Sequence, residues 1–257
     1  MRGLMFNKEI FYYYSRSHMF SKKMNEMSKR LLWRRGFGGV ARLRNVLVVN
    51  AGSSSLKMEI VNDSDEIREW SDDDDDVKNV KNVDCVVHRV VHGGEIYNEA
   101  SIVNETMLNE LEELRALAPL HNPVAVEMIQ KYMKIFPDVP HVACFDTAFH
   151  TKTMSEVQYR YAIPSNRDET KRIRKYGFHG LNHQYTSREA ARQLDLLNKP
   201  SAIVVAHLGN GASVCAVRDG RSVNTSMVRP LLRVSLSLTH TQNNVMYMCR
   251  VSHLWKD

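Results

Sequence analysis

A small turn rich in serine and glycine, Gly52 to Ser55, has the composition of an anion site. The segments on either side of it, Val46–Val49 and Leu56–Val61, have the apolar, β-branched composition of strands. In such a turn, backbone N–H groups and serine hydroxyl groups can converge on an anion. Asn50 ends the first segment and faces the turn. The sequence therefore predicts a hairpin that holds phosphate.

A second segment of the same design lies between residues 203 and 217. Its apolar run ends at the polar residue His207, and a Gly/Asn/Gly/Ser turn, residues 209–213, leads into another apolar run. Two ordinary hairpins with glycine turns are the alternative interpretation of each segment alone. Their similarity to each other instead favours a duplicated domain that grips one polyphosphate from both sides.

Six motifs occur in an order and at spacings that resemble the acetate kinase family. They are Asn50-Ala-Gly-Ser-Ser-Ser-Leu-Lys57, His88-Arg-Val-Val-His-Gly-Gly94, Ala118-Pro-Leu-His-Asn-Pro123, Phe145-Asp-Thr-Ala-Phe-His150, Tyr176-Gly-Phe-His-Gly180 and His207-Leu-Gly-Asn-Gly211. The resemblance covers roughly Asn45 to Met227. It implies an α/β fold of the actin-like, sugar-kinase-like ATPase type, with duplicated ribonuclease H-like domains around a cleft. The implied phosphotransferase reaction converts ATP and acetate reversibly into ADP and acetyl phosphate, with Mg²⁺ as cofactor and a homodimer as the assembly.

The implied chemistry is an electrostatic problem, because acetate is already ionised at neutral pH and needs no general base. Bringing its carboxylate onto the anionic γ-phosphate calls for positive charge, hydrogen-bond donors and a divalent cation. The resemblance places Arg89 in the substrate pocket, where a planar guanidinium suits a carboxylate or a phosphoryl oxygen. A structural ion pair is the alternative role for Arg89. His179 resembles the histidine that donates to the transferring phosphoryl group, and His121 and His207 resemble further contacts to phosphoryl oxygens.

Asp146 corresponds to the family's catalytic acidic residue. Since acetate needs no base, we expect Asp146 to act indirectly, by ordering Mg²⁺ through water or by orienting Arg89. Asn50 corresponds to a metal-site residue, and Arg174 matches a further positive residue near the site. The residues that correspond to nucleotide-phosphate contacts are Ser53, Ser55, Lys57, His207, Leu208, Gly209, Asn210 and Gly211.

The methyl group of the acceptor needs a small apolar pocket. The resemblance assigns this pocket to Val91, Leu120 and Phe178, although core packing explains each of them equally well. One extra methylene group changes binding by only about 1–3 kcal/mol. Propionate is therefore an alternative acceptor.

The motif-dense sequence stops at Met227. By the resemblance, the family continues with a loop whose arginine stabilises the transition state, with adenosine-binding loops and with a metal-binding glutamate, and residues 228–257 match none of these. We expect a truncation or a reading-frame change after Met227, with a shortened paralogue as the alternative. A catalytically inactive remnant that binds phosphate or nucleotide is then the alternative to a working kinase, and its second hairpin would have an unpaired edge.

The elements that must position these residues form a mixed α/β pattern. Strands are expected at Asp84–Val91 and His141–Phe145, and helices between Asn104 and Leu117, at Pro123–Ile135 and at residues 181–197. We expect residues 46–150 to form a first actin-like domain and residues 151–227 to begin a second one.

The two ends of the chain are basic and the middle is acidic. Residues 1–45 hold eleven Lys and Arg against two Glu, residues 228–257 hold four against one Asp, and residues 46–227 carry a net charge of −6 although the whole chain carries +6. The charge therefore gives no support to a nucleic-acid partner. Residues 1–45 resemble an organelle transit peptide, with a disordered tail or a wrongly chosen start codon as alternatives. We expect them outside the fold, and a cytoplasmic or mitochondrial location.

The remaining composition indicates few special features. The four cysteines, Cys85, Cys144, Cys215 and Cys249, are far apart and have no metal-site spacing, so free thiols in a reducing compartment are expected. The run Asp72–Asp76 predicts a solvated loop more readily than a metal site. No apolar run approaches the roughly 20 residues that a spanning helix needs, so no membrane partner is expected.

Overall fold

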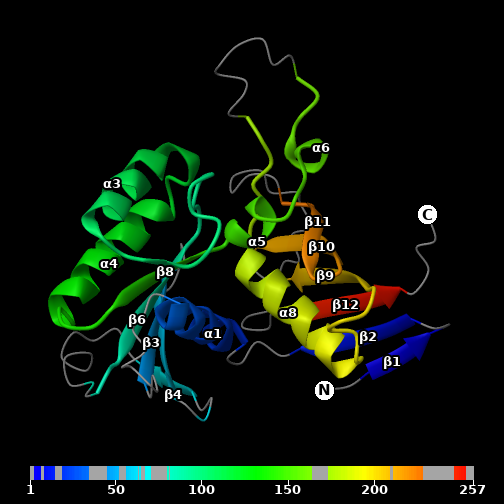
Figure 1. Cartoon of the computed structure of the whole chain (residues 1–257), viewed down its shortest axis with the longest axis horizontal. Helices are drawn as coiled ribbons and strands as arrows, with labels where there is room; N and C mark the ends of the chain where they lie inside the picture. Colours follow the sequence, from blue (N-terminus) through cyan, green and yellow to red (C-terminus); the bar gives the residue numbers. More distant parts are fainter. Residues whose placement is uncertain are drawn as a thin grey trace. The chain divides into compact units, whose positions relative to one another are not determined.

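The computed structural model describes residues 3–6, 9–14, 19–34, 45–51, 56–62, 64, 67–70, 80, 82–163, 173–208, 211–227 and 246–252. The chain divides into two compact units (Figure 1). The first unit is His18–Ala148, and the second unit joins Met1–Ser17 to Phe149–Asp257. The predicted carboxylate run Asp72–Asp76 lies outside the described residues.

The first unit is built on one mixed sheet. Its strands are β3 (Asn45–Ala51), β4 (Leu56–Asn62), β5 (Ile67–Trp70), β6 (Cys85–Val90), β7 (Ser101–Ile102) and β8 (His141–Phe145). The order in the sheet is β5-β4-β3-β6-β8-β7, in which β3, β6 and β8 run parallel. Parallel strands place their carboxyl ends at one edge of a sheet, which is where ligands bind in α/β folds. The residues at or near the ends of these three strands therefore gather at this edge.

Two helices cover one face of this sheet. Helix α3 (Glu105–Glu113) continues into the 3-10 helix η1 (Leu114–Leu117), and α4 (Asn122–Ile135) follows. The predicted cap is confirmed, because Asn104 Oδ1 accepts a hydrogen bond from Met107 N at 2.8 Å. Tyr132 of α4 packs with Leu47 and Val49 of β3 in one buried cluster. These helices thus bury one side of the central strands.

The expectation that residues 1–45 lie outside the fold is wrong for residues 3–6 and 9–14, which form two strands of the second unit, and for residues 19–34. These residues form helix α1 (Met19–Arg34), which contacts β3, β4, β6 and β8 (Figure 1). Met24 and Leu32 are buried, and so are Ser21, Asn25 and Ser28 at helical spacing. Val46 and Val48 point away from α4 by strand alternation and are buried as well. Helix α1 therefore covers the second face of the sheet.

The second unit contains an antiparallel sheet of order β1-β2-β12-β9-β10-β11. Its strands are β1 (Gly3–Phe6), β2 (Glu9–Tyr14), β9 (Ala202–Leu208), β10 (Ala212–Arg218), β11 (Arg221–Thr225) and β12 (Met246–Ser252). Strand β12 pairs with β9 along its whole length, from Met246 opposite Leu208 to Ser252 opposite Ala202. The expectation that the second hairpin has an unpaired edge is therefore wrong.

Helix α8 (Gly180–Gln193) packs on the second sheet. Its Ala190 and Ala191 lie in one buried cluster with Val205 of β9 and Cys215 of β10. The short helices α5 (Ala148–Thr151) and α6 (Glu156–Tyr159) precede it. By strand alternation, His207 and Ser213 continue the face that α8 covers, at the turn end of the β9–β10 hairpin. The face of the β9–β10 hairpin that α8 covers thus ends in two polar residues, His207 and Ser213.

The thiols and the charges agree with the broader expectations. Cys85, Cys144 and Cys215 are free and buried, and burial raises the pKa of Cys144 to about 12 and that of Cys215 to about 11. Such thiols are poor nucleophiles.

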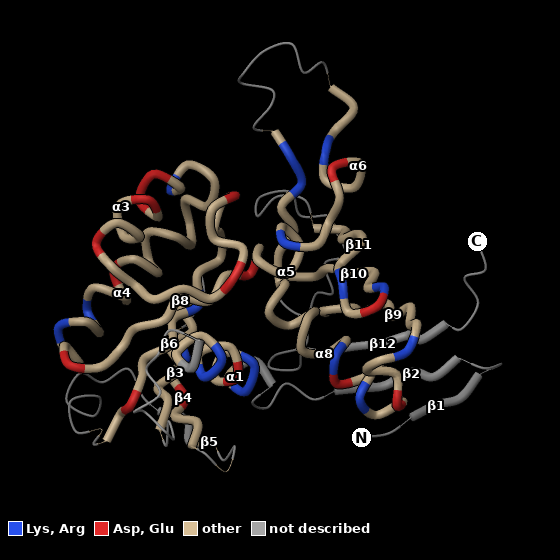
Figure 2. The backbone as a smooth tube through the Cα atoms, viewed as in Figure 1, with Lys and Arg blue, Asp and Glu red and all other residues tan. Residues whose placement is uncertain are grey.

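Lys and Arg follow α1, whereas Asp and Glu predominate along α3 (Figure 2). Among the described helices, none is long and apolar enough to cross a membrane.

Candidate functional site

Arg89 is held at the carboxyl edge of the first sheet by two side chains from neighbouring strands. Its Nε and Nη2 donate to Asp146 Oδ2 at 3.2 and 2.6 Å, and its Nη1 donates to Asn50 Oδ1 at 3.1 Å. Asp146 follows β8 and is 1% exposed, and its backbone N–H donates to Val90 O at 3.0 Å. These three predicted site residues thus meet because β3, β6 and β8 end together.

This geometry fixes a permanent positive charge in one orientation. A guanidinium whose two sides are hydrogen-bonded loses little further rotamer freedom when an anion binds beside it. The contact with Asp146 is the arrangement that an orienting role for Asp146 requires. It also gives the ion pair that was the alternative role for Arg89, so the contact alone does not choose between binding and structure.

The oxygen atoms around Arg89 are chemically suited to magnesium. Asn50 supplies an amide oxygen and Asp146 a carboxylate oxygen, and both face the same guanidinium. Mg²⁺ in kinase sites usually takes one or two carboxylates together with substrate phosphates and water. Within the described ranges no group of three or more His, Cys, Asp and Glu side chains is arranged to hold a metal ion. The donor set thus fits a cation that relies on phosphate for part of its ligands.

His121 stands at the start of α4, near this cluster. Burial lowers the pKa of His121, the Arg89 charge lowers it further, and Asp146 acts in the opposite direction. Its Nδ1 is buried without a hydrogen-bond partner in the part of the chain that the structure describes. A neutral imidazole beside a guanidinium acts as a hydrogen-bonding group, and its positive charge appears only at lower pH.

Two supporting residues of this site were not predicted from the sequence. Asn122, fully buried, accepts from His92 N at 3.2 Å and donates to His92 O at 3.0 Å. Thr147 accepts from Gly93 N at 3.1 Å. Both lie inside recognised motifs, beside the residues that were singled out. They hold the turn after β6 against α4 and the end of β8.

The second unit carries a cluster of four histidines at the polar end of its sheet. The rings of His179 and His207 stack at 4.0 Å between centroids, 14° from parallel. His179 Nδ1 and His183 Nε2 are each 2.8 Å from Ser213 Oγ. His150 Nδ1 is 2.7 Å from Ser222 Oγ, and its Nε2 lies 3.1 Å from Phe178 O. His183 and His150 were not predicted as site residues and fall within or beside the motifs.

The backbone at this cluster is unusual. His179 precedes α8 in the left-handed region, at φ 57° and ψ 22°, which non-glycine residues adopt rarely and often at functional sites. Gly177 has φ +77°, and a Cβ there would lie 2.6 Å from the His150 ring. A Cβ on Gly211 would lie 3.2 Å from His179 Cε1 and 3.3 Å from Nε2. The Nε2 edge of His179 therefore faces Gly211.

The remaining predicted residues have varied environments. The Arg174 guanidinium lies 3.6 Å from the centre of the Tyr159 ring. Val91 and Phe178 are buried, whereas Leu120 is 59% exposed. Lys57 is exposed on β4, opposite Asn50. Leu208 ends β9 and pairs with Ala212. Four predicted phosphate contacts, Ser53, Ser55, Gly209 and Asn210, lie outside the described residues. The roles of all these residues stay predictions.

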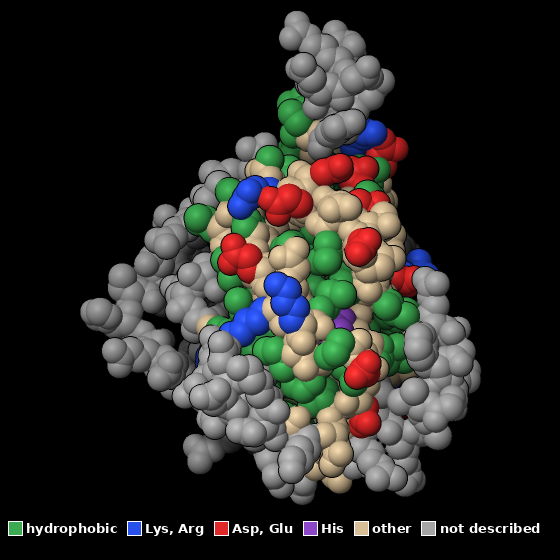
Figure 3. Space-filling view, turned by 90° about the vertical axis from the view of Figure 1, so that its left-hand side faces the viewer, with side chains coloured by type: hydrophobic (Ala, Val, Ile, Leu, Met, Phe, Trp, Pro, Cys, Tyr) green, Lys and Arg blue, Asp and Glu red, His purple; other side chains and the backbone are tan. Residues whose placement is uncertain are grey.

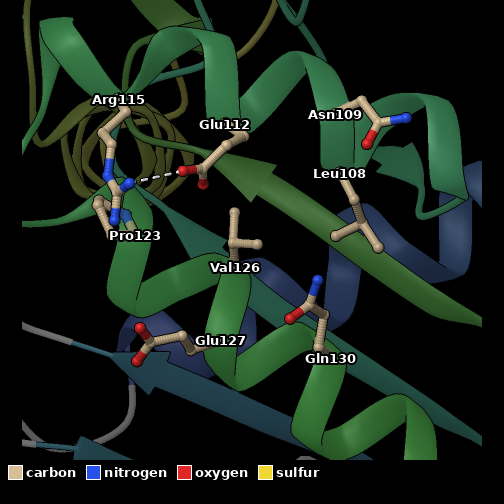
Figure 4. Close-up of a pocket in the computed structure, with 8 residues that line it drawn as sticks. All are labelled: Leu108, Asn109, Glu112, Arg115, Pro123, Val126, Glu127 and Gln130. Atoms are coloured by element: carbon tan, nitrogen blue, oxygen red, sulfur yellow. Dashed lines mark ion pairs between the residues drawn. The ribbon is translucent and has the colours of Figure 1, made fainter.

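A pocket on the first unit lies away from the predicted residues. It has a volume of about 290 Å³ between α3 and α4, with Leu108 and Val126 inside and the Glu112–Arg115 ion pair at 2.9 Å on its border (Figure 4). On the face of the molecule that carries these helices, hydrophobic side chains lie between acidic and basic ones (Figure 3). None of the pocket residues belongs to the six motifs except Pro123. The pocket is thus not part of the candidate site.

Comparisons with known proteins agree on one family. The model of the acetokinase family matches residues 65–235. Similar curated proteins include the acetate kinase of Thermosipho africanus, 50% identical over 151 residues, and that of Agathobacter rectalis, 39% identical over 227 residues. These alignments cover 59% and 71% of this chain but 37% and 57% of the relatives. The chain thus spans between about a third and three fifths of the length of these curated relatives.

Solved structures give the same result. A propionate kinase from Francisella tularensis aligns with a TM-score of 0.62 and 35% identity, over 72% of this chain and 57% of that one. The acetate kinase of Porphyromonas gingivalis aligns with a TM-score of 0.59 and 31% identity, over 71% and 57%. The predicted fold class is confirmed by these matches. The family match extends past Met227 to residue 235 and begins after the first hairpin.

Proposed function

Because the chain belongs to the acetokinase family, we propose that it carries the site of a phosphotransferase that converts ATP and acetate reversibly into ADP and acetyl phosphate. The observation that carries the proposal is the Arg89 guanidinium, fixed between Asp146 and Asn50 at the carboxyl edge of the first sheet. An anionic acceptor and an anionic phosphoryl group repel each other, so their approach requires a fixed positive charge of this kind.

In this proposal Arg89 binds oxygen atoms of the acceptor carboxylate or of the phosphoryl group. Asp146 orients the guanidinium and takes no proton from the substrate, since acetate is already ionised. His179, His207 and His121 donate hydrogen bonds to phosphoryl oxygens, whose charge is spread over three atoms during transfer. Lys57 and the two glycine turns contribute to binding the nucleotide phosphates, and Arg174 supplies a further positive charge for the substrate.

Asn50 and Asp146 are the residues that would hold magnesium in this site. When bound, Mg²⁺ neutralises charge on the phosphate oxygens. The chain's own contribution is to present an amide oxygen and a carboxylate oxygen beside Arg89. The Asp146 carboxylate, the Asn50 amide and the Arg89 guanidinium thus lie together in one partly buried site.

Acetate is the proposed acceptor, and propionate is the alternative. The solved relatives include both an acetate kinase and a propionate kinase. Val91, Leu120 and Phe178 are the residues proposed to contact the alkyl group. The ratio of kcat/KM for the two acids tests this choice, and a ratio near one would leave the pocket without the proposed selectivity.

A second candidate is binding of phosphate or nucleotide without turnover. The observation that favours it is β12, which joins β9 in an antiparallel direction, whereas β6 joins the similar strand β3 in parallel. Because β12 is antiparallel to β9, its carboxyl end lies at the edge opposite to His207. In the first unit, by contrast, the carboxyl end of β6 brings Arg89 to the edge where Asn50 lies.

We also propose that the protein forms a homodimer, which sedimentation tests, and that it is located in the cytoplasm or in mitochondria, which import of a reporter fused to residues 1–45 tests.

The test is ATP-dependent formation of acetyl phosphate by the 257-residue chain, trapped with hydroxylamine. For a working kinase, Arg89→Ala should lower the rate by roughly 10²-fold or more, because one such contact is worth ~2.7–4 kcal/mol. Arg115→Ala, which removes an exposed ion pair of the same unit, should change the rate little. A near-normal rate in Arg89→Ala would contradict the proposal. Binding of acetyl phosphate by an inactive chain would favour the second candidate.

A further inference from the structure

The hydroxyl group of Ser213 lies between two histidine side chains. Its Oγ is 2.8 Å from His179 Nδ1 and 2.8 Å from His183 Nε2. A serine hydroxyl has one hydrogen, so it donates to one of these histidines and accepts from the other. The ring nitrogen of His183 that carries the proton therefore determines which ring nitrogen of His179 carries one.

His183 sets the direction of this chain of hydrogen bonds. Burial lowers the pKa of His183 well below its usual value, and the neighbouring His150 and His179 lower it further. The ring is therefore neutral and carries a single N–H group. Its Nδ1 is buried and has no hydrogen-bond partner among the residues that the structure describes. Buried N–H groups without a partner are rare, and unpaired acceptors are tolerated more often, so the proton belongs on Nε2.

The tautomer of His183 sets the direction of the hydrogen bond that Ser213 makes to His179. His183 Nε2–H donates to Ser213 Oγ, the serine O–H then donates to His179 Nδ1, and the proton of a neutral His179 resides on Nε2. We infer that Ser213 and His183 are positioning residues that hold His179 in its Nε2–H tautomer. The distances and the buried position of Ser213 carry this inference.

The surroundings of His179 keep this nitrogen in place. The ring of His207 stacks on it at 4.0 Å, which limits rotation of the His179 ring. Gly211 leaves room beside Cε1 and Nε2, because any Cβ there would lie 3.2 and 3.3 Å from these atoms. Nε2 therefore faces Gly211 and carries the N–H group of the ring.

The tautomer matters for an anionic ligand, and this step rests on the proposed function. An N–H group attracts a phosphoryl oxygen, whereas the lone pair of an unprotonated ring nitrogen repels it. With the opposite tautomer, the same ring in the same place would oppose the ligand. Ser213 and His183 thus act on the phosphoryl group through His179 and without touching it.

The neighbouring Ser222 provides a matched control. Ser222 is also fully buried, and its Oγ lies 2.7 Å from His150 Nδ1. The tautomer of His150 is fixed separately, because His150 Nε2 lies 3.1 Å from the carbonyl oxygen of Phe178, to which only an N–H can donate. Replacing Ser222 thus removes a similar bond from the same sheet without changing the partner of His179.

The experiment is ¹H–¹⁵N correlation NMR of the full chain labelled on the histidine rings, at pH 8, where an ordinary histidine is neutral. The His179 signals are identified by their absence in His179→Gln. We expect the Nε2–H tautomer of His179 to predominate strongly over the Nδ1–H tautomer. In Ser213→Ala the Nδ1–H tautomer should rise by roughly tenfold, as expected for the loss of one buried hydrogen bond. Ser222→Ala should leave His179 unchanged.

A second pair of variants separates this relay from packing. His183→Gln keeps an N–H₂ group near the position of Nε2 and should retain the parent tautomer, whereas His183→Leu should give a mixture like that of Ser213→Ala. If Ser213→Ala does not fold, His183→Leu carries the same prediction. An Nδ1–H tautomer of His179 in the parent, or the parent tautomer in both Ser213→Ala and His183→Leu, would overturn the inference. These spectra need no substrate, so an inactive chain with the expected tautomer would disprove the proposed function and leave the inference standing.

Discussion

Strands β3 and β9 begin two similar hairpins, yet they are buried differently. Leu47 of β3 and Val204 of β9 occupy the same position, three residues before Asn50 and His207, but Leu47 is 0% exposed and Val204 is 40% exposed. Helices α1 and α4 cover both faces of β3, whereas α8 packs on the face of β9 that carries Val205. The similar sequences thus fix the hairpin, and the covering helices decide how much of it is core.

The strand beside each hairpin differs as well. β6 runs parallel to β3, so its end delivers Arg89 to the edge where Asn50 lies. β12 runs antiparallel to β9, so Met246 at its start lies beside Leu208 and its last residues lie at the opposite edge. An antiparallel neighbour satisfies the backbone hydrogen bonds of β9 equally well. Its amino end, and not its carboxyl end, lies at the edge where β9 ends.

The largest expected effect comes from shortening the matched pair of side chains. Leu47→Ala should lower the free energy of unfolding by about 3–5 kcal/mol, because it leaves a cavity in a fully buried cluster. Val204→Ala should lower it by less than about 1 kcal/mol, since its side chain already meets solvent. Urea unfolding followed by circular dichroism measures both. Equal losses would show that the two strands are equally buried and would break the comparison.

A somewhat smaller effect tests helix α1, which lies on the second face of the first sheet. Met24→Ala should cost about 2–4 kcal/mol if α1 packs on β3, β4, β6 and β8. Arg30→Ala removes an exposed ion pair with Glu26 on the same helix and should cost less than about 1 kcal/mol. The midpoint of thermal unfolding measures the difference. If both variants behave like the parent, α1 does not cover the sheet.

Helix α1 shows why part of the fold could not be predicted from the sequence. Its buried positions, 21, 23, 24, 25, 28 and 32, hold two serines, an asparagine and a lysine beside Met24 and Leu32. Hydrophobic periodicity is the main signal for an amphipathic helix, and small polar residues on the buried face weaken it. The Asn104 cap, in contrast, was predictable because the bond to Met107 N spans three residues. A cap that joins neighbouring residues can be predicted from the sequence, whereas packing of a helix against strands far away in the chain cannot.

The candidate site divides in the same way. Asn50, Arg89 and Asp146 were predicted as site residues from the motifs to which they belong, and the parallel pairing of their strands, which the structure supplies, explains why they meet. Ser213 and His183 were not predicted, although Ser213 lies two residues after the motif that ends at Gly211. Their contact depends on the register of β10 against β9 and on the rotation of α8. Neither quantity is visible in the spacing of residues along the chain.

The smallest expected effect concerns a feature that the two units share, a buried neutral histidine. In the first unit, His88 Nε2 donates to His141 Nδ1 at 3.0 Å, because His141 Nε2 is committed to Phe136 O at 3.0 Å. Burial, followed by the effect of His141, lowers the pKa of His88 well below its usual value. In the second unit, burial lowers the pKa of His183 in the same way. Neither side chain takes a proton readily while the chain is folded.

Above pH 6.5 neither the folded nor the unfolded chain protonates these histidines, so they leave the stability unchanged. Below pH 6.5 the unfolded chain binds protons that the folded chain refuses, and stability falls by about 1.4 kcal/mol per pH unit for each such histidine. His92, whose pKa burial lowers to about 4, contributes between pH 6.5 and about 4. Replacing His88 or His183 by Gln should each reduce the slope between pH 6 and 4.5 by about 1.4 kcal/mol per pH unit. Urea unfolding across this range measures it, and a slope that changes for one variant only would show that a single unit buries its histidine.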